Sequence, residues 1–301
     1  MKSLKLFYAS IFICVALFTT VHASDSKTGA LLWKISGNGL VKPSYILGTF
    51  HLAPKTKLDS IPGATKALED CEQVVGEIVM SEMMAHVQKI QQAGMMPPDT
   101  TYQMLYTEEE YEKVNDGIKE FMGIGLDQMG VLKPSMIQTT IVVFMYQQFF
   151  PNIQVEQVMD NYVQQYASAA GKTILGLENI DDQVYALFNS SSLKRQAEQL
   201  FCLFEHIEYN HDNTTELMDA YNRADFIAIQ ALIDDNENPC PSSQEEIDIL
   251  LKNRNDNWVE KLPEIMSEKS SFIAVGAGHL VGNVGILTQL EKLGYLVDPV
   301  K

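Results

Sequence analysis

Two histidines follow the same short pattern near opposite ends of the sequence. Residues 48–52 and 276–280 both read G-x-x-H-L, which places His51 and His279 at the fourth position of each copy. A third candidate, Glu77, comes directly after an apolar Val-Val-Gly run. Neutral imidazole and carboxylate groups are ligands for Zn, Mn, Co or Fe. Three such ligands leave coordination positions open for water and substrate, as metal-assisted hydrolysis requires.

Each of these candidates follows a run that is typical of a β-strand. Residues 44–47 precede the first motif, residues 271–275 precede the second, and residues 73–76 precede Glu77. If the three strands lie in one sheet with like ends together, the side chains gather at one rim, where open α/β sheets usually bind ligands. The sequence therefore predicts a site for a divalent metal (Mn, Co or Zn) held by His51, Glu77 and His279. The alternative is two hydrogen-bonded histidines and a surface carboxylate at strand ends.

Two further residues are candidates for catalysis beside Glu77. Glu178 follows the strand-like residues 173–177 and could be a fourth ligand or a general base; a helix-capping acid is an equal alternative. Arg254 shares a helical face with Trp258 and could stabilise an oxyanion, or else form a salt bridge with the many acids of this chain. Asn255 would point elsewhere on that helix, and its role stays open.

The order of the strand-like runs predicts an α/β fold of mixed type. Residues 31–35 and 44–47 should pair as a hairpin around a Gly-Asn-Gly turn. A helix over about residues 60–71 should connect to the strand at 73–76 by a right-handed crossover, which makes the two strands parallel neighbours. We expect a central mixed β-sheet built from the N- and C-terminal segments. A large helical insertion, about residues 81–258, would form a lid or second lobe.

Capping boxes mark two of the expected helix starts. Thr107 with Glu110 predicts a helix from Glu108, and Ser243 with Glu246 predicts a helix that continues through Arg254.

The first residues are typical of a signal peptide. A positively charged start and an apolar stretch over residues 6–19 precede Val21-His22-Ala23, a small-x-small pattern that predicts cleavage after Ala23. Residues 24–301 would then be one domain, secreted or periplasmic. The alternative is an uncleaved N-terminal membrane anchor; beyond it, no membrane contact is expected.

Charge and cysteines limit the partners and the compartment. The full chain has a formal charge of −17, which argues against nucleic acid as a partner. No C-x-x-C occurs, so a zinc finger or thioredoxin-type site is not expected. In an oxidising compartment Cys202 and Cys240 are the expected disulfide pair, and Cys71 is expected to be buried.

An ordered set of motifs resembles one protein family. The set comprises Tyr45 to His51, Gly76-Glu77, Gly176-Leu177-Glu178, Arg254 to Trp258, Val275 to Leu280, and Gly285. In this order the chain is similar, from Leu32 to Pro299, to the TraB/PrgY/GumN family. That family includes the TIKI proteins, membrane-tethered metalloproteases that depend on Mn or Co, and looks distantly related to erythromycin-esterase-like and haem-binding ChaN-like proteins. The resemblance implies that His51, Glu77 and His279 form the active site, and proteolysis is an expectation from the resemblance alone.

These observations together predict a metal-dependent hydrolase of peptidase type, with a peptide or protein as substrate. Two alternatives stay open. One is a protein that binds a peptide, a metal or haem without turnover, and the other is a non-peptidase hydrolase such as an esterase.

Overall fold

The computed structural model describes residues 29–51, 53–149, 158–235 and 237–301. The expected signal peptide, residues 1–23, lies outside these ranges. Among the described helices, none has the length and apolar character needed to cross a membrane.

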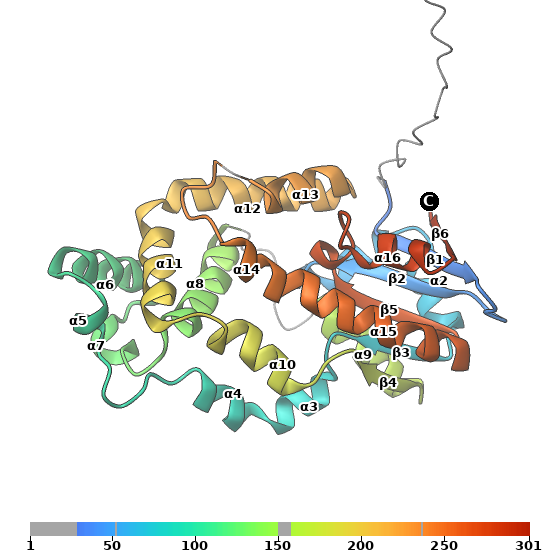
Figure 1. The fold of residues 1–301 in the computed structure, drawn as a ribbon, viewed down its shortest axis with the longest axis horizontal. Coiled ribbons are helices and arrows are strands. Elements are labelled where there is room, and N and C mark those ends of the chain that lie inside the picture. The colour runs from blue at the N-terminus through green and yellow to red at the C-terminus, as the bar shows by residue number, and fades with distance from the viewer. Residues whose placement is uncertain (1–28, 52, 150–157, 236) are drawn as a thin grey trace, which may run out of the picture.

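Six strands of the described residues form one mixed sheet in the order β4-β3-β5-β2-β1-β6 (Figure 1). β1 pairs antiparallel with β2 and with β6, whereas β2, β5, β3 and β4 run parallel. The expected hairpin and the mixed α/β class are confirmed. The strands are β1 (Leu32–Gly37), β2 (Ser44–Thr49), β3 (Gln73–Gly76), β4 (Thr173–Gly176), β5 (Ser271–Gly276) and β6 (Tyr295–Pro299).

β5, the fifth of the six described strands in sequence order, lies inside the parallel part of the sheet, between β3 and β2. Its Ala274 pairs with Leu47 of β2 on one side and with Gly76 of β3 on the other. β2 and β3 are therefore parallel, as expected, but the prediction that they are neighbours is wrong. A strand–helix–strand order fixes the direction of the second strand, and it cannot exclude that a much later segment inserts between the two.

Helices precede, connect and cover these strands. They are α1 (Lys55–Ser60), α2 (Ala64–Asp70), α3 (Met80–Ala85), α4 (Val87–Ala93), α5 (Tyr102–Leu105), α6 (Glu108–Met122), α7 (Leu126–Met129), α8 (Pro134–Phe149), α9 (Met159–Ala169), α10 (Ile180–Val184), α11 (Leu193–Glu205), α12 (Ile207–Asn222), α13 (Phe226–Ile233), α14 (Gln244–Ile247), α15 (Asn253–Glu268) and α16 (Ile286–Lys292).

The helix starts at the two capping boxes are confirmed, whereas the helix expected from Ser60 starts later and the helix after Ser243 is divided. Thr107 and Ser243 each accept a hydrogen bond from the backbone three residues later. The helix expected to begin at Ser60 begins instead at Ala64, as α2, after Gly63 with a φ of 73°. Ser60 is the last residue of α1, and its hydroxyl donates to the Lys57 carbonyl instead of capping a new helix. The helix after Ser243 passes through a π-helical turn at 248–252 before α15 begins.

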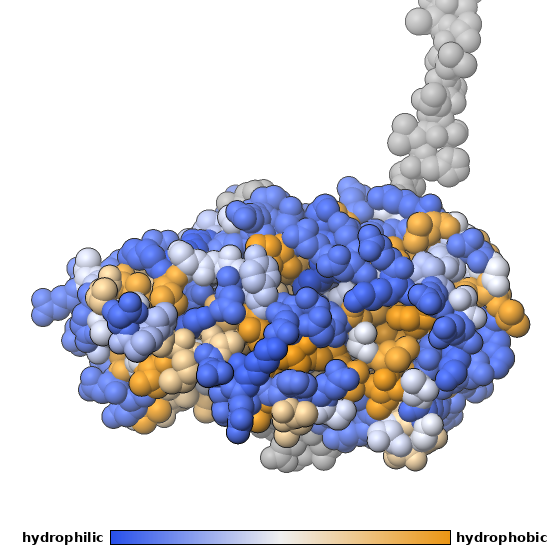
Figure 2. Space-filling view, turned by 60° about the horizontal axis from the view of Figure 1, so that its bottom comes forward, coloured by the Kyte–Doolittle hydropathy of each residue, from blue (hydrophilic) through white to orange (hydrophobic). Residues whose placement is uncertain are grey.

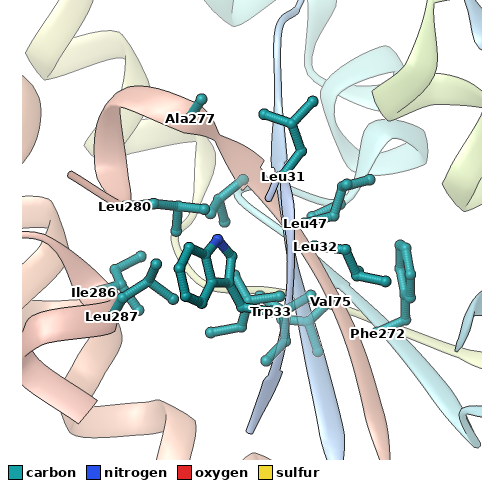
Figure 3. Packing of buried hydrophobic residues seen from close by; sticks show 14 of the residues in the cluster. Leu31, Leu32, Trp33, Leu47, Val75, Phe272, Ala277, Leu280, Ile286 and Leu287 are labelled. Atoms are coloured by element: carbon teal, nitrogen blue, oxygen red, sulfur yellow. The ribbon is translucent and has the colours of Figure 1, made fainter. Parts of the chain in front are cut away.

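The main core lies on both faces of the sheet. Figure 3 shows Trp33 on the side of Ile286 and Leu287 from α16, whereas Leu32 and Phe272 point to the opposite side. This alternation follows from the two-residue period of a strand. Side chains therefore pack against both faces of the sheet and stabilise the position of the rim at the carboxyl ends of its parallel strands.

A second hydrophobic cluster lies among the middle helices. It contains Ile118 of α6, Ile137 of α8 and Leu200 of α11, all with no exposed surface. In Figure 1 these helices stand beside the sheet, and α12 and α13 run from them toward it. Hydrophilic residues cover much of the face in Figure 2, with hydrophobic residues gathered toward its middle. The division into a domain with a helical insertion stays a prediction.

The expected disulfide between Cys202 and Cys240 is present, with an S–S distance of 2.09 Å. It joins α11 to the loop that precedes α14. Arg195 reinforces this junction: its Nε donates to Glu246 Oε1 at 2.9 Å, and its Nη2 donates to the Pro241 carbonyl at 2.7 Å.

The cysteines give the first testable prediction. Cys71 is 2% exposed, and burial raises the pKa of its thiol to about 11, so the thiolate that reacts is scarce in the folded chain. A chain of residues 24–301 should therefore take up no maleimide when native, one when denatured without reductant, and three when denatured and reduced. Mass spectrometry counts the labels. Rapid labelling of the native chain would contradict the burial of Cys71.

Candidate functional site

The parallel strands bring the candidate residues to one rim in the order of the sheet. Gly76 pairs with Gly176, and Thr49 pairs with Gly276, so β3 and β4 end level with each other, as do β2 and β5. Gly76 also pairs with Ala274, so the second pair of strands extends two residues further. Glu178 follows β4, Glu77 follows β3, His279 follows β5 and His51 follows β2. Because like ends of parallel strands meet at the same edge, residues that are far apart in sequence become neighbours.

Glu77 is the centre of this group. Its Oε1 lies 3.7 Å from His51 Nε2 and 3.9 Å from His279 Nε2, and it accepts a hydrogen bond from the Gly276 N–H at 2.8 Å. Burial would raise the pKa of Glu77, but its interactions with the two imidazoles and with Arg254 lower it to about 2. The carboxylate is therefore ionised although it is only 8% exposed.

A glycine is required where the three side chains converge. A Cβ at Gly276 would lie 3.3 Å from both Glu77 Oε1 and His51 Nε2, and 3.6 Å from His279 Cδ2. The space that a side chain would fill is thus bordered by the two imidazoles and the carboxylate. This explains the glycine that ends β5 better than any need for a special backbone angle, because its φ of −53° suits other residues.

Asn255 holds His279 from behind. The amide nitrogen of Asn255 donates to the carbonyls of Val284 at 2.9 Å and His279 at 3.3 Å, so its Oδ1 is the atom 2.7 Å from His279 Nδ1. Nδ1 then carries the proton, and the Nε2 lone pair accepts from Arg254 Nη1 at 3.1 Å. Burial lowers the pKa of His279 to about 4 against the opposing effect of Glu77, which keeps the imidazole neutral.

Asp160 has the same position behind His51. Its Oδ2 lies 3.4 Å from His51 Nδ1, and its Oδ1 accepts from the Thr49 hydroxyl at 2.7 Å. The His51 side chain is 61% exposed because it opens onto a cavity, but protein atoms surround its other sides. Those surroundings lower the pKa of His51, and the hydrogen bond and charge of Asp160 outweigh them and raise it to about 9.

Arg254 of α15 binds the two glutamates together. Its Nε and Nη2 contact both oxygens of Glu178 at 2.9 and 2.7 Å, and Nη2 also donates to Glu77 Oε2 at 2.7 Å. Its Nη1 lies 3.1 Å from His279 Nε2, and its guanidinium carbon lies 4.8 Å from the Trp258 ring centre. These contacts favour the alternative of a structural ion cluster. The predicted catalytic roles of Glu178 and Arg254 stay predictions.

The donor set suits a divalent metal, although the arrangement is more open than a closed metal site. In the described part of the chain, no group of three or more His, Cys, Asp or Glu side chains is placed to hold a metal ion. Arg254 Nη1 also lies 3.1 Å from His279 Nε2, so this lone pair is occupied. The chemical types nevertheless fit: two imidazoles and one carboxylate border the space at Gly276, and each imidazole is held through its Nδ1.

A large cavity opens beside the two histidines. It has a volume of about 970 Å³, and His51, Gly276 and His279 line one part of it. Glu77, Glu178 and Arg254 do not line it. Of these site residues, the two imidazoles therefore face the cavity, and the two glutamates and the arginine do not.

Sequence reasoning missed Asp160 and Thr49 and left Asn255 without a role. Asp160 is the acidic residue in the first turn of α9, a common position that gives no sign of a partner 109 residues away. Asn255 gave a usable signal: a polar residue next to Trp258 on an amphipathic helix needs a buried partner if that face packs inward.

Comparison with known proteins gives one family and several distant relatives. The model of the TraB/PrgY/gumN family matches residues 31–299. The chain is 22% identical to the Danio rerio protein named metalloprotease TIKI2, with 91% of this chain and 62% of the relative covered. It is 27% identical to a Nematostella vectensis metalloprotease TIKI homolog, over 48% of this chain and 36% of that protein.

A Xenopus tropicalis metalloprotease TIKI2 is 23% identical, with 91% of this chain and 60% of the relative covered. The chain thus spans about three fifths of the length of the two TIKI2 relatives. No solved structure gives a significant match. The match to the family model over nearly the whole described chain shows that this protein belongs to the TraB/PrgY/gumN family.

Proposed function

We propose that this protein is a metal-dependent hydrolase of peptidase type. The observation that carries the proposal is the convergence of three donors: the Nε2 atoms of His51 and His279 both face Glu77 Oε1 beside a large cavity. The names of the metalloprotease relatives support the reaction class. His51, Glu77 and His279 would hold the metal, which would be Mn, Co or Zn.

The chain's own residues prepare this site in three ways. Asn255 and Asp160 orient the imidazoles, and the Gly276 N–H orients the Glu77 carboxylate. Arg254 helps the imidazoles to keep Glu77 ionised, but it also occupies His279 Nε2 and would give up that contact to a metal, because one lone pair cannot serve two partners. The chemistry that a bound metal supplies is Lewis-acid activation of water and of a carbonyl group.

The disulfide supports a secreted or periplasmic location. Disulfides persist in oxidising compartments, and the pair Cys202–Cys240 is formed. Localisation and signal-peptide cleavage after Ala23 accordingly belong to the proposal.

The proposal is tested by metal content and by cleavage. Chain loaded with Mn, Co or Zn and then gel-filtered should retain close to one metal ion per chain, measured by mass spectrometry. His51→Ala and His279→Ala should each lose it, because two remaining donors bind weakly. His211→Ala is the matched control, since its side chain is 46% exposed on α12 and lies outside the cavity.

Cleavage of a diverse peptide mixture by the metal-loaded chain should stop in both histidine variants and continue in the control. Full metal retention by both histidine variants would refute the assignment of the ligands. Retention by the wild-type chain without cleavage of peptides or esters would favour the binding protein.

A further inference from the structure

The cavity beside the histidines is large enough for several side chains of a substrate. Its volume of about 970 Å³ is at the upper end of the ~300–1,000 Å³ range of small-molecule sites. It extends from the sheet rim between α8, α12 and α13 to the loop before α14. A single small metabolite would leave much of it filled with water.

The walls of the cavity are mainly apolar. Met145 of α8, Leu217 of α12, Leu232 and Ile233 of α13, and Leu250 of the π-helical turn all line it. Apolar surface in contact with water gains about 25 cal/mol per Å² when a ligand covers it. The walls therefore favour a substrate with apolar side chains over a strongly polar one.

One end of the cavity wall carries two carboxylates. His51, the lining imidazole whose pKa is raised, is paired with Asp160 and not with them. Asp234 and Asp235 line the cavity, and no lysine or arginine is among the described residues that do. Asp235 is fixed in place, because it accepts from the Tyr209 hydroxyl and from the Glu237 N–H. Asp234 accepts from Gln230 Nε2 at 2.7 Å. Both are held by neutral donors, so their charges stay unbalanced at this wall.

Resting on the proposed function, we propose that the substrate is a peptide segment of apolar residues that carries a cationic nitrogen. The apolar part would lie between His51, His279 and Leu232, and the cation would lie at Asp234 and Asp235. A lysine or arginine side chain and a free amino end share this chemistry. The apolar surface of the wall would select the apolar residues, and its two carboxylates would select the cation.

Binding without turnover tests the proposal separately from catalysis. Fluorescently labelled hexapeptides of leucine and phenylalanine, acetylated and amidated, carry lysine, norleucine or glutamate at one position. Anisotropy is recorded with the metal-free chain, its disulfide intact. The lysine peptide should bind about tenfold more tightly than the norleucine peptide, equivalent to about 1.4 kcal/mol. The glutamate peptide should bind most weakly. A norleucine peptide with a free amino end shows whether that end replaces lysine.

Two pairs of variants make the test specific. Asp235→Asn should abolish the preference for lysine and keep the binding of norleucine, whereas Asp219→Asn on the exposed side of α12 should change neither. Leu232→Glu should weaken the binding of all peptides without basic groups, because Leu232 lines the cavity. Ile227→Glu should not, because Ile227 lies on the same helix but is 53% exposed and does not line the cavity.

Equal binding of the three peptides, or a lysine preference that survives Asp234→Asn/Asp235→Asn, would overturn the proposal. These outcomes are independent of metal and cleavage. A failure here therefore leaves the hydrolase proposal standing, and a failure of cleavage leaves this result intact.

Discussion

Replacing Arg254 with methionine should lower the free energy of unfolding of the metal-free chain by about 3–5 kcal/mol, the usual cost of breaking a buried ion pair. The side chains of Glu77 and Glu178 are only 8% and 3% exposed, and Arg254 is the cation that contacts both. Without Arg254, the carboxylates of Glu77 and Glu178 would be buried close together with no cation in contact with both. Denaturant titration in the presence of a chelator measures the loss.

A second substitution distinguishes uncompensated charge from lost packing. In the double variant Arg254→Met/Glu178→Gln, only Glu77 keeps an unpaired negative charge, so part of the stability should be restored. Arg195→Met is the matched control, since Arg195 and Glu246 form a similar forked pair that is more exposed, at 33% and 15%, and exposed pairs contribute about 0–1 kcal/mol. Equal losses in Arg254→Met and Arg195→Met would contradict the assignment of Arg254 to a buried cluster.

The same Arg254 variant should bind Mn or Co more tightly than the wild-type chain. Two effects act in this direction: a positive charge leaves the neighbourhood of Glu77, and the Nε2 lone pair of His279 becomes available. Isothermal titration at equal protein concentration provides the measurement. Weaker metal binding by this variant would show that Arg254 supports the metal instead of competing with it.

Replacing Asn255 with alanine should weaken metal binding by about 10–100-fold, the usual effect of removing a group that orients a ligand. Asn255 is fully buried, and its Oδ1 fixes the proton on His279 Nδ1 at 2.7 Å. The alanine variant loses this anchor, so the imidazole can rotate or carry its proton on Nε2. Nitrogen chemical shifts of labelled histidine report the tautomer directly, apart from any activity.

Conservative variants separate orientation from folding in this case. Asn255→Asp keeps the acceptor for Nδ1 and should recover metal affinity, although it loses the amide donors to the Val284 and His279 carbonyls. Asp160→Asn is the corresponding change behind His51. An unchanged histidine tautomer in Asn255→Ala would contradict the positioning role, even if stability falls.

The strands and the histidine rim could be predicted because each has a local signal, and the disulfide could be proposed because the three cysteines of residues 24–301 leave few pairings. Apolar runs followed by G-x-x-H-L mark strand ends whatever their partners are. Strand adjacency had no such signal: nothing in residues 44–76 indicates that Ala274 will pair with Leu47 and Gly76 at once. Neighbours in a sheet are decided by packing over the whole chain, which periodicity does not contain.

The candidate site divides in the same way. His51 and His279 could be proposed from motif and strand context, and Glu77 from its place after an apolar run. Asp160 could not, because its only distinguishing feature is its contact with Thr49 and His51 in space. Arg254 shares a helical face with Trp258, as expected. Whether its guanidinium contacts a substrate or the glutamates depends on where α15 packs against the sheet, which the sequence does not show.

The central place of β5 has a consequence for how this chain is made. β2 and β3 leave the ribosome long before β5, and neither can complete its pairing until residues 271–276 arrive between them. The parallel sheet therefore closes late, with contacts of large sequence separation, which slows folding. Residues 271–276 lie near the C-terminal end of the sequence, so the segments that carry His51 and Glu77 cannot be joined in one sheet until most of the chain is available. The rim that gathers His51, Glu77 and His279 therefore forms only when β5 has inserted between β2 and β3.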